Sequence, residues 1–230
     1  MLAENFTLMH EKIKLACEKV NRDPSTVSLL PVSKTFPASV IREAVQLGYT
    51  RFGENKAQEM KQKAIELADY GIDWVIIGYL QTNKAKEVAK YASEIQSLDR
   101  LDLAIALDKR LQQEGRAIDA LIQVKTSHEE SKTGMAIDDV PGFLKSLKPF
   151  DTLNIKGFMT VAENTDQQDI VRQCFKQVAD LAEQMRQATG LALPTLSMGM
   201  SGDYELAIAE GATEIRIGSA IFGQRDYSSH

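Results

Sequence analysis

Short β-rich runs alternate with segments of helical period along most of the chain. After one opening helix, predicted for residues 2–20, this alternation repeats eight times. Several of the runs are continuously apolar, as buried parallel strands are. The predicted strands are 28–34, 51–55, 74–79, 94–99, 120–126, 153–160, 195–200 and 214–219.

Eight repeats of roughly 24 residues each leave room for a strand, a helix and two short connections, and no room for a second domain. An open doubly wound sheet is the alternative, but such sheets usually have fewer strands and a glycine-rich first turn, which is missing after the first run. We therefore predict a single (β/α)8 TIM barrel. The opening helix and a linker occupy residues 1–27, the barrel residues 28–223 and a tail residues 224–230.

The composition narrows the range of functions. With 43% hydrophobic and 26% charged residues the chain has the make-up of a globular protein. A net charge of −5, with Lys and Arg interleaved with acids, gives no basic surface for nucleic acid. The N-terminus lacks a leader pattern and no apolar stretch is long enough for a membrane span, so we expect a cytoplasmic protein. Separately, we expect the protein to be a monomer.

Two other features carry little chemistry. The two cysteines, Cys17 and Cys174, lie far apart in helical segments, so neither a metal site nor a disulfide is expected. The lysine-rich segments 56–61 and 84–87 are interpreted as solvated outer faces of barrel helices.

In a barrel of this kind the chemistry lies at the C-terminal ends of the strands, and Lys34 ends the first predicted strand. A lysine at the end of an apolar run is partly desolvated, which favours the neutral amine that imine formation requires. The alternative is that Lys34 extends to the rim or pairs with a carboxylate such as Glu54.

Small and hydroxylated residues follow the seventh and eighth strands, where barrels commonly hold a phosphate. They include Ser201, Gly202, Gly218 and Ser219. Their backbone N–H groups and hydroxyls, together with helix N-termini, could bind a phosphate monoester without Lys or Arg. Each of them taken alone is equally typical of an ordinary turn or helix cap.

Arg216 lies inside the eighth strand, and a buried guanidinium needs a partner. That partner is either a neighbouring Glu or a pyridine nitrogen, which stays unprotonated opposite a permanent positive charge. An amine-reactive lysine, a phosphate cup and an arginine together describe a site for pyridoxal phosphate.

The chain also resembles a known family, the pyridoxal-phosphate-binding homeostasis proteins, which are small single-domain relatives of the alanine racemase barrel. The resemblance covers nearly the whole chain. It rests on 32–35 (Val-Ser-Lys-Thr), 52–55 (Phe-Gly-Glu-Asn), 77–78 (Ile-Gly) with 80–81 and 83–84, 131–134 (Ser-Lys-Thr-Gly), 157–159 (Gly-Phe-Met), 196–201 (Leu-Ser-Met-Gly-Met-Ser) and 215–223 (Ile-Arg-Ile-Gly-Ser-Ala-Ile-Phe-Gly).

The resemblance implies a barrel like the alanine racemase N-terminal domain and a set of cofactor-binding residues. Those residues are Lys34 as the Schiff-base lysine, Asn55 near the cofactor, Ser201, Gly218 and Ser219 at the phosphate, and Arg216 at the pyridine nitrogen.

Three residues are candidates for a secondary role. Lys132 matches a second lysine of the family, which either captures or transfers free cofactor or is simply solvated. Met198 and Met200 either pack against the cofactor ring or fill the core. The sequence departs from the family at Val75 and Tyr79, so an imidazole contact from the third strand is not expected.

Racemases of this class use two bases, whereas only Lys34 is evident here, and an unprotonated ring is a weak electron sink. We therefore expect a non-enzymatic protein that buffers pyridoxal phosphate, delivers it to apoenzymes by transient contact, and so affects amino-acid balance. The alternative is an amino-acid racemase or lyase in which Tyr79 or Asp99 supplies the missing acid or base. A third possibility is a regulatory module that binds a protein in a cofactor-dependent way.

Overall fold

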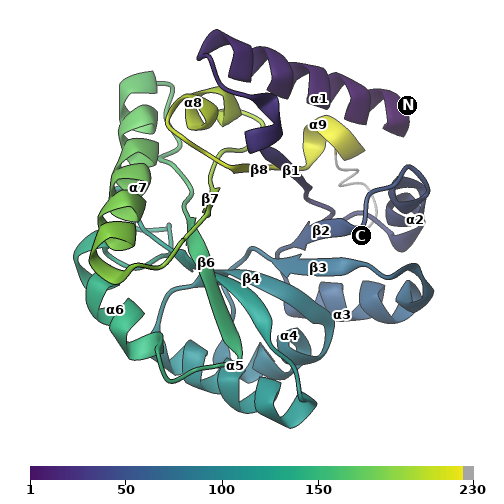
Figure 1. Ribbon diagram of the computed structural model, residues 1–230. Coiled ribbons are helices and arrows are strands. Elements are labelled where there is room, and N and C mark those ends of the chain that lie inside the picture. Colours follow the sequence, from purple (N-terminus) through teal and green to yellow (C-terminus); the bar gives the residue numbers. More distant parts are fainter. Residues whose placement is uncertain (225–230) are drawn as a thin grey trace.

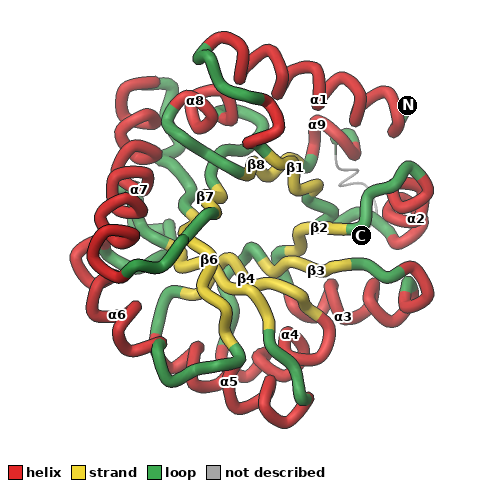
Figure 2. Tube along the Cα trace, viewed as in Figure 1, coloured by secondary structure: helices red, strands yellow, loops and turns green. Residues whose placement is uncertain are grey.

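Eight parallel strands surround a central axis, and the helices lie outside them (Figures 1 and 2). The computed structural model describes residues 1–224. The strands are β1 (Ser28–Pro31), β2 (Arg51–Glu54), β3 (Asp73–Ile76), β4 (Ala92–Leu98), β5 (Ile118–Gln123), β6 (Leu153–Met159), β7 (Thr195–Ser197) and β8 (Glu214–Ile217). The α-helices are α1 (Leu2–Lys19), α2 (Ala38–Gln46), α3 (Ala57–Glu66), α4 (Ala85–Tyr91), α5 (Leu101–Glu114), α6 (Val140–Leu147), α7 (Gln168–Thr189), α8 (Tyr204–Ala209) and α9 (Ser219–Phe222).

The strands are hydrogen-bonded in the order β1-β8-β7-β6-β5-β4-β3-β2. This arrangement confirms the (β/α)8 barrel predicted from the alternation, and the opening helix is α1. The tail predicted at 224–230 lies, apart from Gln224, outside the described residues. Within residues 1–224 the structure contains no helix that is both long enough and apolar enough to cross a membrane.

β1 and β2, at the two ends of this order, meet through much less pairing than most other neighbours. They share one isolated parallel bridge, between Val32 and Gly53, which includes a hydrogen bond from the Ser33 N–H to the Gly53 carbonyl at 3.0 Å. We call this junction the β1–β2 seam. It completes the ring of strands, and it lies directly before Lys34.

All eight strands end one to three residues earlier than predicted, which moves candidate residues from strands into loops, as the ends of β1 and β7 show. β1 ends at Pro31 and β7 at Ser197. The chain leaves β7 at Gly199, whose φ of 101° does not belong to a strand. A Cβ there would also lie 2.7 Å from the Cβ of Ala207, so the turn after β7 packs tightly on α8.

α1 packs on the outside of the barrel against α8, α9 and α2 (Figure 1). The ring of Phe6 stacks on Tyr49 and meets Phe222 edge-on, with centroid separations of 3.7 and 6.2 Å. The amide of Asn5 donates to the Ile221 carbonyl at 2.8 Å. These contacts tie the first helix to the last one.

Substitution of Gly157 tests how closely β6 and β7 approach each other. Its φ is 151°, and a Cβ there would lie 1.8 Å from the Thr195 carbonyl oxygen on β7. We expect Gly157→Ala to lower the free energy of unfolding by at least about 3 kcal/mol, because β6 and β7 must separate. Urea denaturation measures this change.

Gly142→Ala in α6 is the matched control, because a Cβ at this position would meet no other atom within 4 Å. We expect this change to stabilise the protein by up to about 1 kcal/mol through helix propensity. Equal effects of the two substitutions would contradict the packing argument.

Candidate ligand-binding site

A cavity of about 420 Å³ lies at the C-terminal ends of the strands. It receives side chains from both sides of the β1–β2 seam and from the loops after β7 and β8. All six residues predicted to bind the cofactor line it: Lys34, Asn55, Ser201, Arg216, Gly218 and Ser219. The barrel therefore brings together residues that are far apart in the sequence.

Lys34 and Asn55 lie on adjacent loops, because β1 and β2 are neighbours across the seam. Lys34 is partly buried and follows the Ser33 hydrogen bond to β2. Asn55 follows β2 directly, and its backbone touches Gly78, where a Cβ would lie 2.3 Å from the Asn55 carbonyl oxygen. Gly78 is therefore needed for the close approach of the loop after β3.

Arg216 points from β8 into the barrel with only 3% of its surface exposed. Its guanidinium donates to Ser197 Oγ at 2.9 Å and to the Thr160 carbonyl at 3.0 Å. Both acceptors are neutral, while the neighbouring Glu214 accepts hydrogen bonds from Arg51 and Gln96. Burial lowers the pKa of Arg216 to about 10, against the opposing effects of Glu214 and Asp203, so the group remains charged near neutral pH.

A chain of polar side chains continues from Ser197 through the barrel interior. Ser197 Oγ donates to Gln96 Oε1 at 2.6 Å, and the Gln96 amide donates to Glu94 at 2.9 Å and Glu214 at 2.6 Å. Arg51 then pairs with both carboxylates, at 2.6 and 2.5 Å. The polar side chains of this chain are thus hydrogen-bonded to one another, as is usual for buried polar groups.

The small residues after β7 and β8 form the remaining wall. Asp203 Oδ1 accepts the Met200 N–H at 2.7 Å and holds the turn that carries Ser201. Gly218 precedes α9 and approaches β1, since a Cβ there would lie 3.2 Å from the Val32 carbonyl oxygen. α9 has only four residues, so its dipole is small, and the hydroxyls and first-turn N–H groups are the main donors available to an anion.

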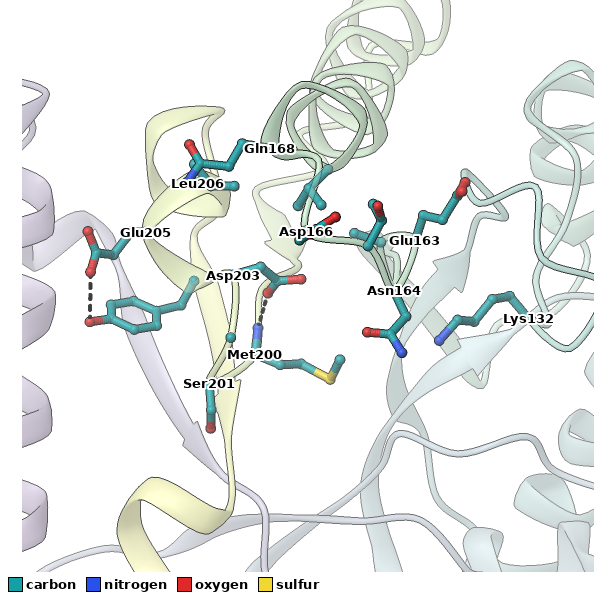
Figure 3. A pocket seen from close by; sticks show the side chains of 15 residues that line it. Lys132, Glu163, Asn164, Asp166, Gln168, Met200, Ser201, Asp203, Glu205 and Leu206 are labelled. Carbon is teal, nitrogen blue, oxygen red and sulfur yellow. Dashed lines mark hydrogen bonds between the residues drawn. The ribbon is translucent and has the colours of Figure 1, made fainter.

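Lys132 lies in a second, adjoining cavity of about 710 Å³ (Figure 3). This cavity is formed by the loops after β5, β6 and β7, and it shares Met200, Ser201 and Gly202 with the first one. Lys132 is 3.9 Å from Glu129, its ion-pair partner. The structure thus places Lys132 beside the candidate site and outside its lining.

The two candidate methionines, Met198 and Met200, lie in different environments. Met200 is exposed and lines both cavities, whereas Met198 is fully buried in the hydrophobic core. Met198 therefore fills the core, which was the alternative open at the sequence level. Gln123 and Val161, which also line the cavity, belong to none of the motifs identified in the sequence.

The proposed alternative acid and base are both held by one arginine. The guanidinium carbon of Arg100 lies 4.6 Å from the centre of the Tyr79 ring, and Arg100 donates to Asp99 at 2.8 Å. Tyr79 lines the cavity at its mouth and is half exposed. Within residues 1–224 no group of three or more His, Cys, Asp or Glu side chains could hold a metal ion.

Glu54, considered above as a partner for Lys34, is completely buried. Its Oε1 accepts hydrogen bonds from Lys63 Nζ at 2.6 Å and from Ser33 Oγ at 2.7 Å. Burial raises the pKa of Glu54 to about 7, although Lys63 and Ser33 oppose the shift. Its Oε2 is buried without a hydrogen-bond partner among the described residues, which further disfavours the ionised form.

Comparison with known proteins agrees with this geometry. The family model "Alanine racemase, N-terminal domain" matches residues 10–226. A pyridoxal phosphate homeostasis protein from Pseudomonas aeruginosa is 40% identical over 228 residues, covering 99% of this chain and 97% of the relative. The corresponding protein from Aquifex aeolicus is 37% identical over 224 residues, covering 97% and 98%. The chain belongs to the pyridoxal phosphate homeostasis protein family.

Solved structures of PipY from Synechococcus elongatus show the same fold. Without pyridoxal phosphate, PipY has a TM-score of 0.88 and 35% sequence identity, and with pyridoxal phosphate bound the values are 0.85 and 34%. Each comparison covers 97% of this chain and 100% of PipY. The family resemblance and the fold predicted from the sequence are both confirmed.

The raised pKa of Glu54 predicts a pH dependence of stability. Between the ordinary value of 4.5 and about 7, the folded carboxyl retains a proton that the unfolded one has lost. The unfolded state therefore binds fewer protons, and the contribution of Glu54 to stability falls as the pH rises through this window. We expect wild type to lose stability relative to Glu54→Gln across it.

Urea denaturation of both proteins at the two ends of the window measures the difference. Taking the difference between the two proteins removes the contributions of the other titrating groups. Parallel pH profiles would contradict the raised pKa.

Proposed function

We propose that this protein binds pyridoxal 5′-phosphate reversibly through Lys34 and acts in its intracellular homeostasis. The proposal rests on one observation above all: a lysine, a buried arginine and a set of small hydroxylated residues line the same cavity. The cofactor has an aldehyde, a pyridine nitrogen and a phosphate, which are the groups these side chains can bind. Relatives named for pyridoxal phosphate homeostasis and the ligand-bound structure of PipY support it.

The covalent step needs only the amine of Lys34. Its nitrogen adds to the aldehyde and one water molecule leaves, so that the cofactor is held as an imine, and the reverse reaction with water releases it. Ser201, Ser219 and the backbone at Gly218 would bind the phosphate. Gly78 and Gly218 let the loops after β3 and β8 pack closely on the backbone at Asn55 and Val32, which brings the walls of the cavity together.

Arg216 would face the pyridine nitrogen. Its acceptors on Ser197 and Thr160 are neutral, and its charge is retained on burial. A permanent cation disfavours protonation of the ring nitrogen, and an unprotonated ring withdraws electrons weakly from a bound amino acid. This property favours carriage over catalysis.

The same site favours buffering and delivery over turnover. Tyr79 and Asp99, the two candidates for a second acid or base, are engaged by Arg100. An imine at a cavity open to solvent can exchange with another amine, so transient contact with apoenzymes is sufficient for transfer. Holding the reactive aldehyde as an imine also limits its side reactions. Delivery of the cofactor to apoenzymes would in turn affect amino-acid balance.

The assignment of Lys34 is tested by reduction. We expect wild type, after addition of pyridoxal phosphate, to show the visible absorbance of an imine, which borohydride removes while attaching the cofactor to Lys34. Peptide mapping by mass spectrometry identifies the lysine that is modified.

Lys34→Ala should lose both the band and the attachment, and Lys132→Ala should keep them. Attachment to Lys132 in wild type, or a normal band in Lys34→Ala, would overturn the assignment.

Catalysis is the alternative, and isotope exchange distinguishes it from carriage. A racemase or lyase mechanism requires removal of the α-proton from an amino acid. We expect the loaded protein in deuterated solvent to show no exchange of α-protons beyond that caused by free pyridoxal phosphate. NMR with a panel of amino acids measures the exchange, and rapid exchange that is lost in Tyr79→Phe would favour the enzyme.

A further inference from the structure

Three ionisable side chains outside the cavity contact the residues on either side of Lys34. They are Glu54 at the end of β2 and Glu59 and Lys63 on α3, and we call them the α3 ion cluster. Lys63 Nζ donates to Glu54 at 2.6 Å and to Glu59 at 2.8 Å. None of the three lines the candidate site.

The cluster holds the backbone before Lys34. Lys63 Nζ donates to the Ser33 carbonyl at 2.8 Å, and the Ser33 hydroxyl donates to Glu54 at 2.7 Å. The pairing of β1 with β2 ends at Ser33, so these side-chain contacts take over where the β1–β2 seam ends. Charge-assisted hydrogen bonds of this kind are stronger than neutral ones.

The cluster also holds the backbone after Lys34. The Thr35 N–H donates to Glu59 Oε1 at 2.5 Å. Thr35 has a φ of 70°, a left-handed conformation that is rare for a β-branched residue and costs about 1–3 kcal/mol. Its side chain is exposed and is not anchored by packing, so the contact with Glu59 supports this conformation.

Burying this cluster is expensive for the protein. Glu54 is fully buried and the Lys63 side chain is only 8% exposed. Desolvation of such a pair can exceed its Coulombic gain, and apolar residues of similar volume often stabilise a fold equally well. A role in placing the chain between Ser33 and Thr35 accounts for the charges, because apolar side chains cannot bind a carbonyl on one side and an N–H on the other.

We propose that Glu54, Glu59 and Lys63 are positioning residues that direct the Lys34 side chain into the cavity. The inference rests on the proposed function of Lys34 and extends it to residues that do not touch the ligand. The cluster then sets how readily the amine reaches an aldehyde, while the phosphate and ring contacts are made by other residues. Misplacement of a reacting group by about 1 Å can slow a reaction by two orders of magnitude.

The test introduces Glu59→Ala into two backgrounds, one with Lys34 present and one with Lys34→Ala. Glu59 is a quarter exposed and Ala favours helix, so this variant should fold. With Lys34 present, we expect Glu59→Ala to slow imine formation with pyridoxal phosphate roughly tenfold or more, followed by absorbance. In the Lys34→Ala background, we expect it to leave the non-covalent dissociation constant for pyridoxal phosphate unchanged.

Glu66→Ala is the matched control, because Glu66 lies on the same helix, is exposed and is 4.0 Å from its ion-pair partner Arg42. It should leave both quantities unchanged. Lys63→Met tests the other side of the turn and should also slow imine formation. Urea denaturation of each variant shows whether it is folded under the assay conditions.

The outcomes separate the inference from the proposed function. A weaker non-covalent affinity for pyridoxal phosphate in the Lys34→Ala background would mean that the cluster shapes the whole cavity, and an unchanged rate of imine formation with Lys34 present would mean that it does not position Lys34. Both results would overturn the inference. If wild type itself forms no imine with pyridoxal phosphate, the proposed function fails first. Pyridoxal, which lacks the phosphate, serves as a second probe, and the rate loss should be the same for it.

Discussion

A ring of parallel strands must join its first strand to its second, and in this protein that junction has little backbone pairing and lies directly before Lys34. One isolated bridge, between Val32 and Gly53, connects the chain after β1 to β2. The buried contacts of Glu54 and Lys63 supplement them from the side. The closure of the fold and the placement of the candidate reactive amine therefore depend on the same few interactions.

The barrel interior also shows a compromise between stability and a buried positive charge beside the candidate site. An aliphatic core would avoid desolvation, yet the chain buries Arg216 and provides it with neutral acceptors. The polar chain through Gln96 and Glu214 continues to Arg51 at the opposite end of the barrel. The carboxylates are thus paired with Arg51, and Arg216 keeps a positive charge that no carboxylate contacts directly among the described residues.

Much of this could be predicted from the sequence, for identifiable reasons. The alternation of two periods predicted the barrel, and Lys34 and Arg216 were noticed because a charge beside or within an apolar strand is unusual. Sequence analysis assigned Glu59 to a solvated helix face, because helical periodicity does not show that the loop after β1 contacts this helix through the Thr35 N–H. The burial of Met198 and the displacement of Lys132 into a neighbouring cavity depend on loop paths, which residue patterns do not determine.

The packing of α1 has a consequence for the order in which the chain can fold during synthesis. Asn5 and Ile221, which are hydrogen-bonded, are 216 residues apart, and Phe6 packs against Phe222. When the ribosome has made α1, the helices that cover its apolar face do not yet exist. The first helix must therefore wait, exposed or held by a chaperone, until nearly the whole barrel has emerged, and its docking marks the completion of the fold.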